Sequence, residues 1–569
     1  MSFKAPIKYS EIFDDNAPDL ESLLLSVPKS IFQALGPSLI SVSDPHNNFD
    51  DNKILRKYFS LENQGLKDAI KTIISTQNSR CLHNPITAYR IMEYYFILPL
   101  KETVDLSHHT IELNFWKAYL ILNEQFNNKS NDEVKKMKGT KNALLKNLIS
   151  SINIHDIANY NQRIVLLSQI IKSVRFFEFL ESDPKFHPYL NKFLELKNCK
   201  NYKQYLIKIY ALVAPSLGQI DKTFSDLIVT QDKDFEENNE FLESFSFDES
   251  TVKELPDFVG LRSSPLMKIS KGQYRIISLL FLIETLYKSI RFFITRPVHD
   301  KLASKDQISI YSIISGEFSE NIVLYESLDK IISDKYTKVR GEEFKNLGIE
   351  ESEPDYLAYN EQSILLFESK DVILKGEIKQ SLEFELIEEG LINKFHKTNE
   401  NEKGGGVGIP QLVENVLRIC EGYYNDIIQI ANKSKTKIYP ILVIHDRQFD
   451  TPGINKLLIS WFKSELIQER ENQDISKVQN LTIINNDQLL ALQNILINSK
   501  IELKGFIDKY HKKLSNPKRK RNPDMSFLME KFNSFSTFLE IELKANNNYN
   551  LDKIFEDYIC NVFKDELAS

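Results

Sequence analysis

The sequence predicts a multidomain protein with a mostly α-helical N-terminal half, an α/β core and a helical C-terminal segment. Three observations predict this class. Apolar residues recur at a spacing of three to four through much of the first 255 residues, which is the period of a helix packed on one face. Two short apolar runs flank a polar turn between residues 354 and 370, as in a β-hairpin. Beyond about residue 500 the helical spacing returns.

The N-terminal half is expected to be a helical domain. Few glycines occur before residue 260, and the helical spacing is clearest in four stretches: 66–98, 112–127, 141–173 and 202–213. The acidic stretch 231–250 is typical of a solvated linker.

A chain of 569 residues is long enough for two to four domains. Residues 259–274 predict a small hairpin, and the strongly apolar stretch 275–296 predicts a helix. We therefore expect a helical domain at 1–255, a bridging hairpin and apolar helix at 256–310, an α/β domain at 311–500 and a helical extension at 501–569.

The composition is that of a folded protein. Hydrophobic residues make up 42% and charged residues 27%, which argues against general disorder. The formal net charge is −7 and the pI about 5.9, so any surface that binds nucleic acid has to be local. Basic residues do cluster, at Lys512-Lys513 and at 517–521, where they either contact phosphates or are simply solvated.

The cysteines and the N-terminus indicate the compartment. Four cysteines are far apart and form no C-x-x-C pair, which argues against a zinc knuckle or a disulfide framework and suits a reducing compartment. The N-terminus has no apolar signal core, and no stretch approaches 18 apolar residues. We expect a cytoplasmic protein that does not bind membranes.

The segment 354–370, PDYLAYNEQSILLFESK, is the most informative in the chain. Its polar turn is centred midway between positions 355 and 368. In a symmetric antiparallel hairpin Asp355 therefore lies opposite Glu368, with Cβ atoms about 5 Å apart. Because side chains alternate along a strand, Lys370 points the same way as Glu368. Both faces of the hairpin are otherwise apolar, which predicts a central, covered position in a sheet.

Two carboxylates at this separation suit a divalent cation. Carboxylate oxygens are the ligands that Mg²⁺ or Mn²⁺ prefers, and such a cation activates water against a phosphodiester. Lys370 would orient that water, help to deprotonate it, or stabilise the developing negative charge. Without a metal, Asp355 and Glu368 would repel each other, and one of them would stay protonated near neutral pH.

Chance is the competing explanation, because E-x-K triplets recur in a chain rich in Glu and Lys. Only residues 354–370 join Pro-Asp, a turn and an apolar strand to such a triplet. Histidines at positions 83, 108, 109 and 155 match no metal-ligand spacing, and no G-x-x-x-x-G-K-[ST] motif indicates an ATP site. The glycine-rich residues 404–408 are interpreted as a flexible loop before a helix. Such a loop could lie near the substrate phosphates.

On this motif the chain resembles the PD-(D/E)XK nuclease superfamily, whose restriction-endonuclease-like core has the order αβββαβ. A similar order is found here over about residues 316–500. It comprises a helix at 316–333, a strand at 335–346, the hairpin, a helix that includes Gln411 and Leu412, and a strand at 438–444.

The resemblance also implies supporting residues. Members often carry a metal-supporting glutamate on the first helix, for which Glu320 is the closest match and Glu317 and Glu326 are rivals. The second helix often opens with a polar residue near the metal, which would be Gln411. The implied metal ligands are therefore Asp355, Glu368 and Glu320.

The implied function is that of a Mg²⁺- or Mn²⁺-dependent nuclease, of the endonuclease type, that acts on DNA more readily than on RNA. A nuclease joined to a large helical domain is similar in layout to bacterial anti-phage effectors, in which the added domain senses a trigger or assembles an oligomer. Cutting both strands of a duplex takes two active sites, which favours a homo-oligomer. The alternative is a nucleic-acid-binding or protein-binding module with a catalytically inactive nuclease-like scaffold.

Overall fold

The computed structural model describes residues 4–44, 50–216, 224–247, 256–346, 353–396, 408–431, 435–470, 473–515, 529–545 and 549–564. Contacts divide the chain into two compact units that interleave along the sequence. The first unit comprises residues 1–139, 153–162 and 180–306, and the second unit comprises residues 140–152, 163–179 and 307–569. The expected boundary at 310 lies four residues from the division between Asp306 and Gln307, whereas two segments of the expected helical domain belong to the second unit.

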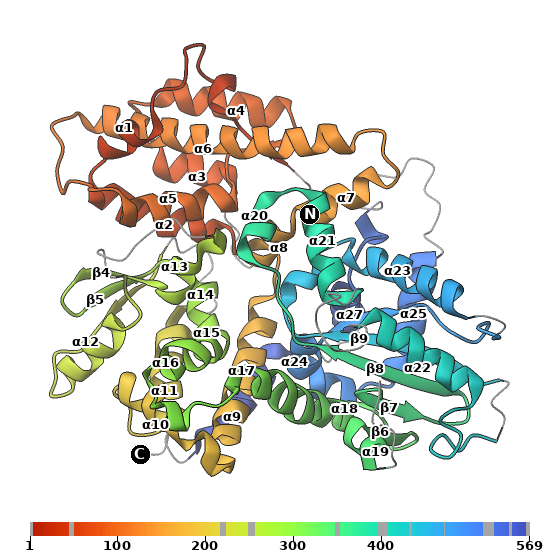
Figure 1. The fold of residues 1–569 in the computed structure, drawn as a ribbon. Coiled ribbons are helices and arrows are strands. Elements are labelled where there is room, and N and C mark those ends of the chain that lie inside the picture. The colour runs from red at the N-terminus through yellow and green to blue at the C-terminus, as the bar shows by residue number, and fades with distance from the viewer. Residues whose placement is uncertain are drawn as a thin grey trace. The chain divides into compact units, whose positions relative to one another are not determined.

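The first unit is built mainly of helices (Figure 1). Its longest helix, α6 (His108–Met137), begins where Ser107 Oγ accepts a hydrogen bond from the amide of Thr110, which satisfies a free donor of the first turn. The helix contacts α1 (Leu20–Leu25) and α5 (Pro85–Ile97). Further elements are β1 (Ala5–Pro6), η1 (Tyr9–Glu11), α2 (Lys29–Val42), α3 (Asp51–Tyr58), η2 (Pro184–Phe186), α10 (His187–Leu196), α11 (Tyr202–Val213), η3 (Ala214–Ser216), η5 (Ile294–Val298), α16 (His299–Lys301) and η6 (Ser304–Asp306).

Two of the long helical stretches expected from sequence are interrupted. Residues 66–98 form α4 (Gln64–Thr76), the short strand β2 (Arg80–Cys81) and α5, because Asn84 caps a new helix that has Pro85 at its first position. Residues 141–173 form α7 (Ala143–Ser150), α8 (Ile152–Ala158) and the start of α9 (Gln162–Ser182).

The prediction of a linker at 231–250 was wrong for the central residues of that stretch. Residues Phe235–Glu243 form helix α12, which buries Phe241 and Leu242. The expected hairpin is present as β4 (Leu266–Ser270) and β5 (Gln273–Ile276), with β3 (Asp226–Ile228) paired to β5. The expected apolar helix is divided into α14 (Leu279–Glu284) and α15 (Lys288–Phe293).

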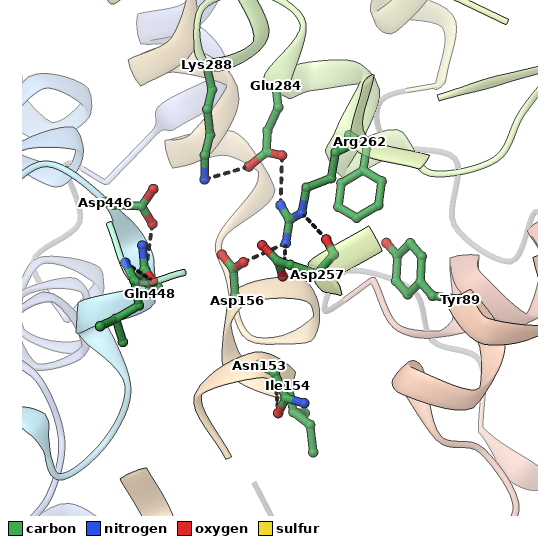
Figure 2. Close-up of polar contacts among 12 residues, drawn as sticks. Tyr89, Asn153, Ile154, Asp156, Asp257, Arg262, Glu284, Lys288, Asp446 and Gln448 are labelled. Atoms are coloured by element: carbon green, nitrogen blue, oxygen red, sulfur yellow. Dashed lines mark hydrogen bonds and ion pairs between the residues drawn. The ribbon is translucent and has the colours of Figure 1, made fainter. Parts of the chain in front are cut away.

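A buried arginine holds the centre of the first unit (Figure 2). Arg262, on α13 (Val259–Ser263), donates from Nη2 to Asp156 Oδ2 at 2.6 Å and from Nη1 to Glu284 Oε2 at 3.0 Å. Its Nε donates to the carbonyl of Asp257, in η4 (Pro256–Phe258), at 2.9 Å. Asp156 and Glu284 are only 1% and 2% exposed, so their charges need compensation inside the protein. Arg262 pairs with both, and Lys288 also lies 3.5 Å from Glu284 Oε1. Burial alone lowers the pKa of Arg262, but the three carboxylates raise it well above its ordinary value.

The second unit contains a mixed five-stranded sheet of order β10-β9-β8-β7-β6 (Figure 1). Strands β6 (Thr337–Arg340), β7 (Tyr356–Tyr359) and β8 (Ser363–Lys370) are antiparallel neighbours. Strands β8, β9 (Lys437–Ile444) and β10 (Thr482–Asn485) run parallel. The hairpin β7–β8 is interior to the sheet and its apolar residues are buried on both faces, as predicted.

A long helix precedes the sheet and consists of α17 (Ile310–Ile313), the π-helical segment η7 (Ile314–Leu324) and α18 (Tyr325–Ile331). Phe318 in η7 packs edge-on against Phe176 of α9, with ring centroids 5.0 Å apart. Arg175 of α9 also pairs with Glu326, at 3.2 Å. Residues 163–179 of α9 therefore support this helix within the second unit.

Helix α22 (Ile409–Glu421) packs on β8 and β9, and α24 (Asn486–Ile497) contacts β10. Two differences from the expected elements stand out. The strand expected at 335–346 is only β6, followed by α19 (Gly341–Asn346), and the polar stretch after the hairpin contains α20 (Gly376–Ser381) and α21 (Phe384–Phe395). Further elements are η8 (Arg447–Asp450), α23 (Ile454–Glu469), α25 (Leu503–Ser515), α27 (Phe535–Lys544) and α28 (Leu551–Val562).

In the described residues a few helices have the length of a membrane span, α6 (His108–Met137) and α9 (Gln162–Ser182) among them. None of the helices there combines the length and the apolar character that crossing a membrane requires.

Candidate functional site

The β7–β8 hairpin brings the two predicted carboxylates together. Asn360 Oδ1 accepts hydrogen bonds from the amides of Gln362 and Ser363, each at 2.9 Å, which closes the turn. The strands pair in the register Tyr356↔Phe367 through Tyr359↔Ile364. One residue beyond this ladder, the same register sets Asp355 opposite Glu368, as the turn midpoint predicted.

The backbone fixes the carboxylate of Asp355. Its Oδ2 accepts a 2.6 Å hydrogen bond from the amide of Ser369, the residue between Glu368 and Lys370. The carbonyl of Asp355 accepts another, at 2.9 Å, from the amide of Gly341. Asp355 is therefore held beside the end of β8, by Ser369 of β8 on one side and by Gly341 on the other.

Glu368 is the most unusual acid of the site because it is only 1% exposed. Lys370 Nζ lies 2.7 Å from its Oε1. Apart from that ammonium, neither carboxylate oxygen has a hydrogen-bond partner in the described part of the chain. Buried carboxylates are normally fully hydrogen-bonded, and an exception calls for a functional explanation.

The charges of the site act on one another. Burial raises the pKa of Asp355 well above its ordinary value, and the negative charges of Glu368 and Glu320 raise it further. Burial also raises the pKa of Glu368, and Lys370 offsets this only in part. Without a cation the site therefore holds protons strongly, as expected for two close carboxylates.

Lys370 keeps its proton. Burial alone would lower the pKa of its ammonium, but Glu368 and Asp355 outweigh that effect and raise it above the ordinary value. A lysine with a raised pKa is charged at neutral pH, so it can orient groups and offset negative charge but is a poor proton acceptor.

Glu320 lies on η7, near enough for its charge to raise the pKa of both Asp355 and Glu368. Its Oε1 accepts a 2.6 Å hydrogen bond from the hydroxyl of Tyr325. Of the two rivals, Glu326 pairs with Arg175 of α9.

Gln411 caps a helix. Its Oε1 accepts from the amide of Gly408 at 3.0 Å, in the third position of α22, where such side chains commonly close the first turn. Gly408 has a positive φ of 67°, and a Cβ there would lie 3.6 Å from Lys370 Cγ. Gln411 thus shapes the helix end beside Lys370. Residues 404–407 of the predicted glycine-rich loop, like 517–521 of the basic cluster, lie outside the described residues.

Sequence reasoning missed three contacts that hold the site. Tyr325 bonds Glu320, Ser319 Oγ donates to Asp371 Oδ2 at 2.6 Å, and Ser369 Oγ shares a 2.8 Å hydrogen bond with His445 Nε2. Asp371 directly follows the E-x-K triplet, so its place at the strand end was visible in the sequence. His445 follows β9 directly, and the next residue, Asp446, caps η8.

The donor set can be compared with the needs of a divalent cation. Among the described residues there is no group of three or more His, Cys, Asp and Glu side chains that could hold a metal ion. Mg²⁺, however, is commonly bound by one or two carboxylates together with waters and substrate phosphates. The carboxylate of Glu368, beside Asp355 and with Lys370 as its described partner, fits that mode of binding.

The chain was also compared with known proteins. No family model, curated protein or solved structure matches it.

Proposed function

We propose that this protein is a metal-dependent nuclease of the PD-(D/E)XK type, which hydrolyses phosphodiester bonds in nucleic acid, DNA in preference to RNA. The carrying observation is Glu368, a carboxylate buried to 1% exposure whose oxygens have no described hydrogen-bond partner beyond Lys370. A protein gains nothing in stability from such a group. Its place opposite Asp355 supports a role in holding a cation.

Each residue has a chemical role in this proposal. Asp355 and Glu368 would hold Mg²⁺ or Mn²⁺, with Glu320 as a third acid that adds negative charge. When bound, such an ion supplies Lewis acidity toward the phosphate and the attacking water. Lys370, protonated at neutral pH, orients the water and offsets charge that develops on the phosphate; its raised pKa favours this over proton abstraction.

The order of elements supports the same class. A helix (α17 to α18), three strands (β6, β7, β8), a second helix (α22) and a fourth strand (β9) follow one another, with α19, α20 and α21 as additions. The motif residues stand at the end of the central strand β8 and at the start of β7. The anti-phage setting rests on similarity of layout, and the homo-oligomer rests also on the two active sites that cutting a duplex requires. Both belong to this proposal.

Cleavage of plasmid DNA and of single-stranded RNA tests it. The wild-type chain should cut in MgCl₂ and stop in EDTA, and Asp355→Ala and Lys370→Ala should each lose on the order of 10²-fold or more in rate. Asp508→Asn is the matched control, since it changes an acid of the same unit that bonds Tyr439 and not the site. Equal rates in all variants would overturn the assignment, and a wild-type chain that binds but never cuts nucleic acid would support the inactive scaffold.

A further inference from the structure

Tyr325 and Glu320 are five residues apart in the sequence. In an α-helix, side chains at this spacing lie on different faces. At 3.6 residues per turn, side chains five apart point about 140° away from each other. Here the helix is π-helical from Ile314 to Leu324, and the amide of Tyr325 donates to the carbonyl of Glu320. This wider turn brings both side chains to one side of the helix, and the phenol hydroxyl reaches Glu320 Oε1 at 2.6 Å. π-Helical turns are rare and often occur at functional sites.

A glycine makes room for the phenol. A Cβ on Gly341 would lie 3.0 Å from the hydroxyl oxygen of Tyr325 and 3.3 Å from the carbonyl oxygen of Asp355. The amide of Gly341 donates to that same carbonyl at 2.9 Å. The glycine at the start of α19 therefore lets Tyr325 approach the backbone of Asp355 while it bonds Glu320.

The hydroxyl is a permanent donor. Tyr325 is 1% exposed. Burial raises its pKa far above the ordinary value, and the charges of Glu320 and Asp355 raise it further. A buried O–H donor to a carboxylate forms a short, charge-assisted bond, which is stronger than a neutral one.

We propose that Tyr325 is a positioning residue: it holds the carboxylate of Glu320 toward the Asp355–Glu368 pair and thereby sets the affinity of the site for a divalent cation. This inference rests on the proposed function, because it concerns the same site. In this role the phenol is not itself a ligand of the cation. It acts through Glu320, as outer-shell hydrogen bonds do when they orient metal ligands and keep them ionised.

Mn²⁺ titration of the full chain by calorimetry tests the inference without any substrate. Tyr325→Phe keeps the ring and removes the hydroxyl, and we expect the Kd for Mn²⁺ to rise roughly 10-fold. Tyr439→Phe is the matched control: it removes an equivalent hydroxyl that donates to Asp508 at 3.0 Å, and its Kd should equal that of the wild type. Far-UV circular dichroism checks that each variant is folded.

Three further variants show whether Tyr325 acts through Glu320: Glu320→Gln, its combination with Tyr325→Phe, and Gly341→Ala. Adding Tyr325→Phe to Glu320→Gln should leave the Kd within about 2-fold of Glu320→Gln alone, because coupled residues are not additive. Gly341→Ala keeps the tyrosine but crowds its hydroxyl oxygen, and should weaken Mn²⁺ binding in the same direction. Gly341→Ala also serves if Tyr325→Phe does not fold.

The outcomes separate the two proposals. A Tyr325→Phe variant that binds Mn²⁺ like the wild type, while Asp355→Ala has lost binding, would overturn the positioning role. A wild-type chain without Mn²⁺ binding would overturn it as well. Tyrosine-dependent Mn²⁺ binding by a chain that cuts neither DNA nor RNA would support the positioning role and refute the nuclease.

Discussion

The amide of Ser369 donates a 2.6 Å hydrogen bond to Oδ2 of Asp355, and so ties the acid before β7 to the backbone of β8 between Glu368 and Lys370. The carboxylate cannot turn away from Glu368 without breaking this bond. Two acids are thus held close in a buried place, where each raises the free energy of the other's charged form.

This arrangement predicts that ionised Asp355 lowers the free energy of unfolding. Because the pKa of Asp355 is raised, the folded chain binds its proton more tightly than the unfolded chain, and the free energy of unfolding falls as pH rises above about 4. Asp355→Asn, whose amide oxygen can still accept from Ser369, should be about 1 kcal/mol or more stable than the wild type at pH 8 in EDTA.

Urea unfolding at several pH values from about 4.5 to about 8 measures the effect, because a carboxyl with a raised pKa loses its proton within this range. The advantage of Asp355→Asn should shrink toward the acid end and disappear in excess Mg²⁺, since a bound ligand stabilises only the wild-type site. Asp508→Asn is the control. An Asp355→Asn variant less stable than the wild type at pH 8 would contradict the prediction.

Lys370 should set the pH range of cation binding. Its ammonium lowers the pKa of Glu368, so Lys370→Met should raise that pKa and let protons compete with Mn²⁺ up to a higher pH. We expect the midpoint of Mn²⁺ binding to move upward in pH in Lys370→Met and to stay in place in Lys370→Arg. Calorimetric titrations across pH would show this, and an unchanged midpoint in Lys370→Met would argue against the coupling.

Gln411 should matter as a helix cap. Gln411→Ala removes the acceptor for the amide of Gly408 and should cost about 1 kcal/mol, whereas Gln411→Glu keeps an acceptor at the same position and should remain near the wild type. Thermal unfolding of the two variants checks this. If Gln411→Ala lost cleavage without any loss of stability, the residue would have a catalytic role beyond the cap.

Arg262 should be the costliest of these residues to remove. Arg262→Met removes the guanidinium that pairs with both buried acids, Asp156 and Glu284, and leaves Glu284 with Lys288. It should lower the free energy of unfolding by about 3–5 kcal/mol. The control Lys271→Met breaks an ion pair whose partners are 61% and 68% exposed, and should change it by less than about 0.5 kcal/mol. A loss below about 1 kcal/mol in Arg262→Met would show that the cluster is not essential to the fold.

The hairpin was predictable because local residues determine it. A four-residue polar turn between two apolar runs leaves one register that buries both faces, and that register alone sets Asp355 across from Glu368. Strand β9 was predictable for a similar reason, as a continuous apolar run in a parallel pair.

Other features depend on contacts that a local pattern does not contain. Helix α21 buries Phe384, Ile387 and Leu391, but the stretch after the hairpin is polar overall, and no helix was predicted there. The contact of Tyr325 with Glu320 follows from a π-helical turn, and a reading based on α-helical spacing places those two residues on different faces. The interleaving of the units follows from tertiary contacts between distant segments.

The packing of α9 has a practical consequence for dissecting the protein. A fragment that starts at residue 311 would contain Asp355, Glu368 and Lys370 yet lack Phe176 and Phe179, which pack against Phe318 two residues before Glu320. Its first helix would present a bare aromatic face to water. Deleting the N-terminal half therefore removes part of the support of the site. An inactive fragment would then be explained by the loss of α9, and would not show that the full chain lacks nuclease activity.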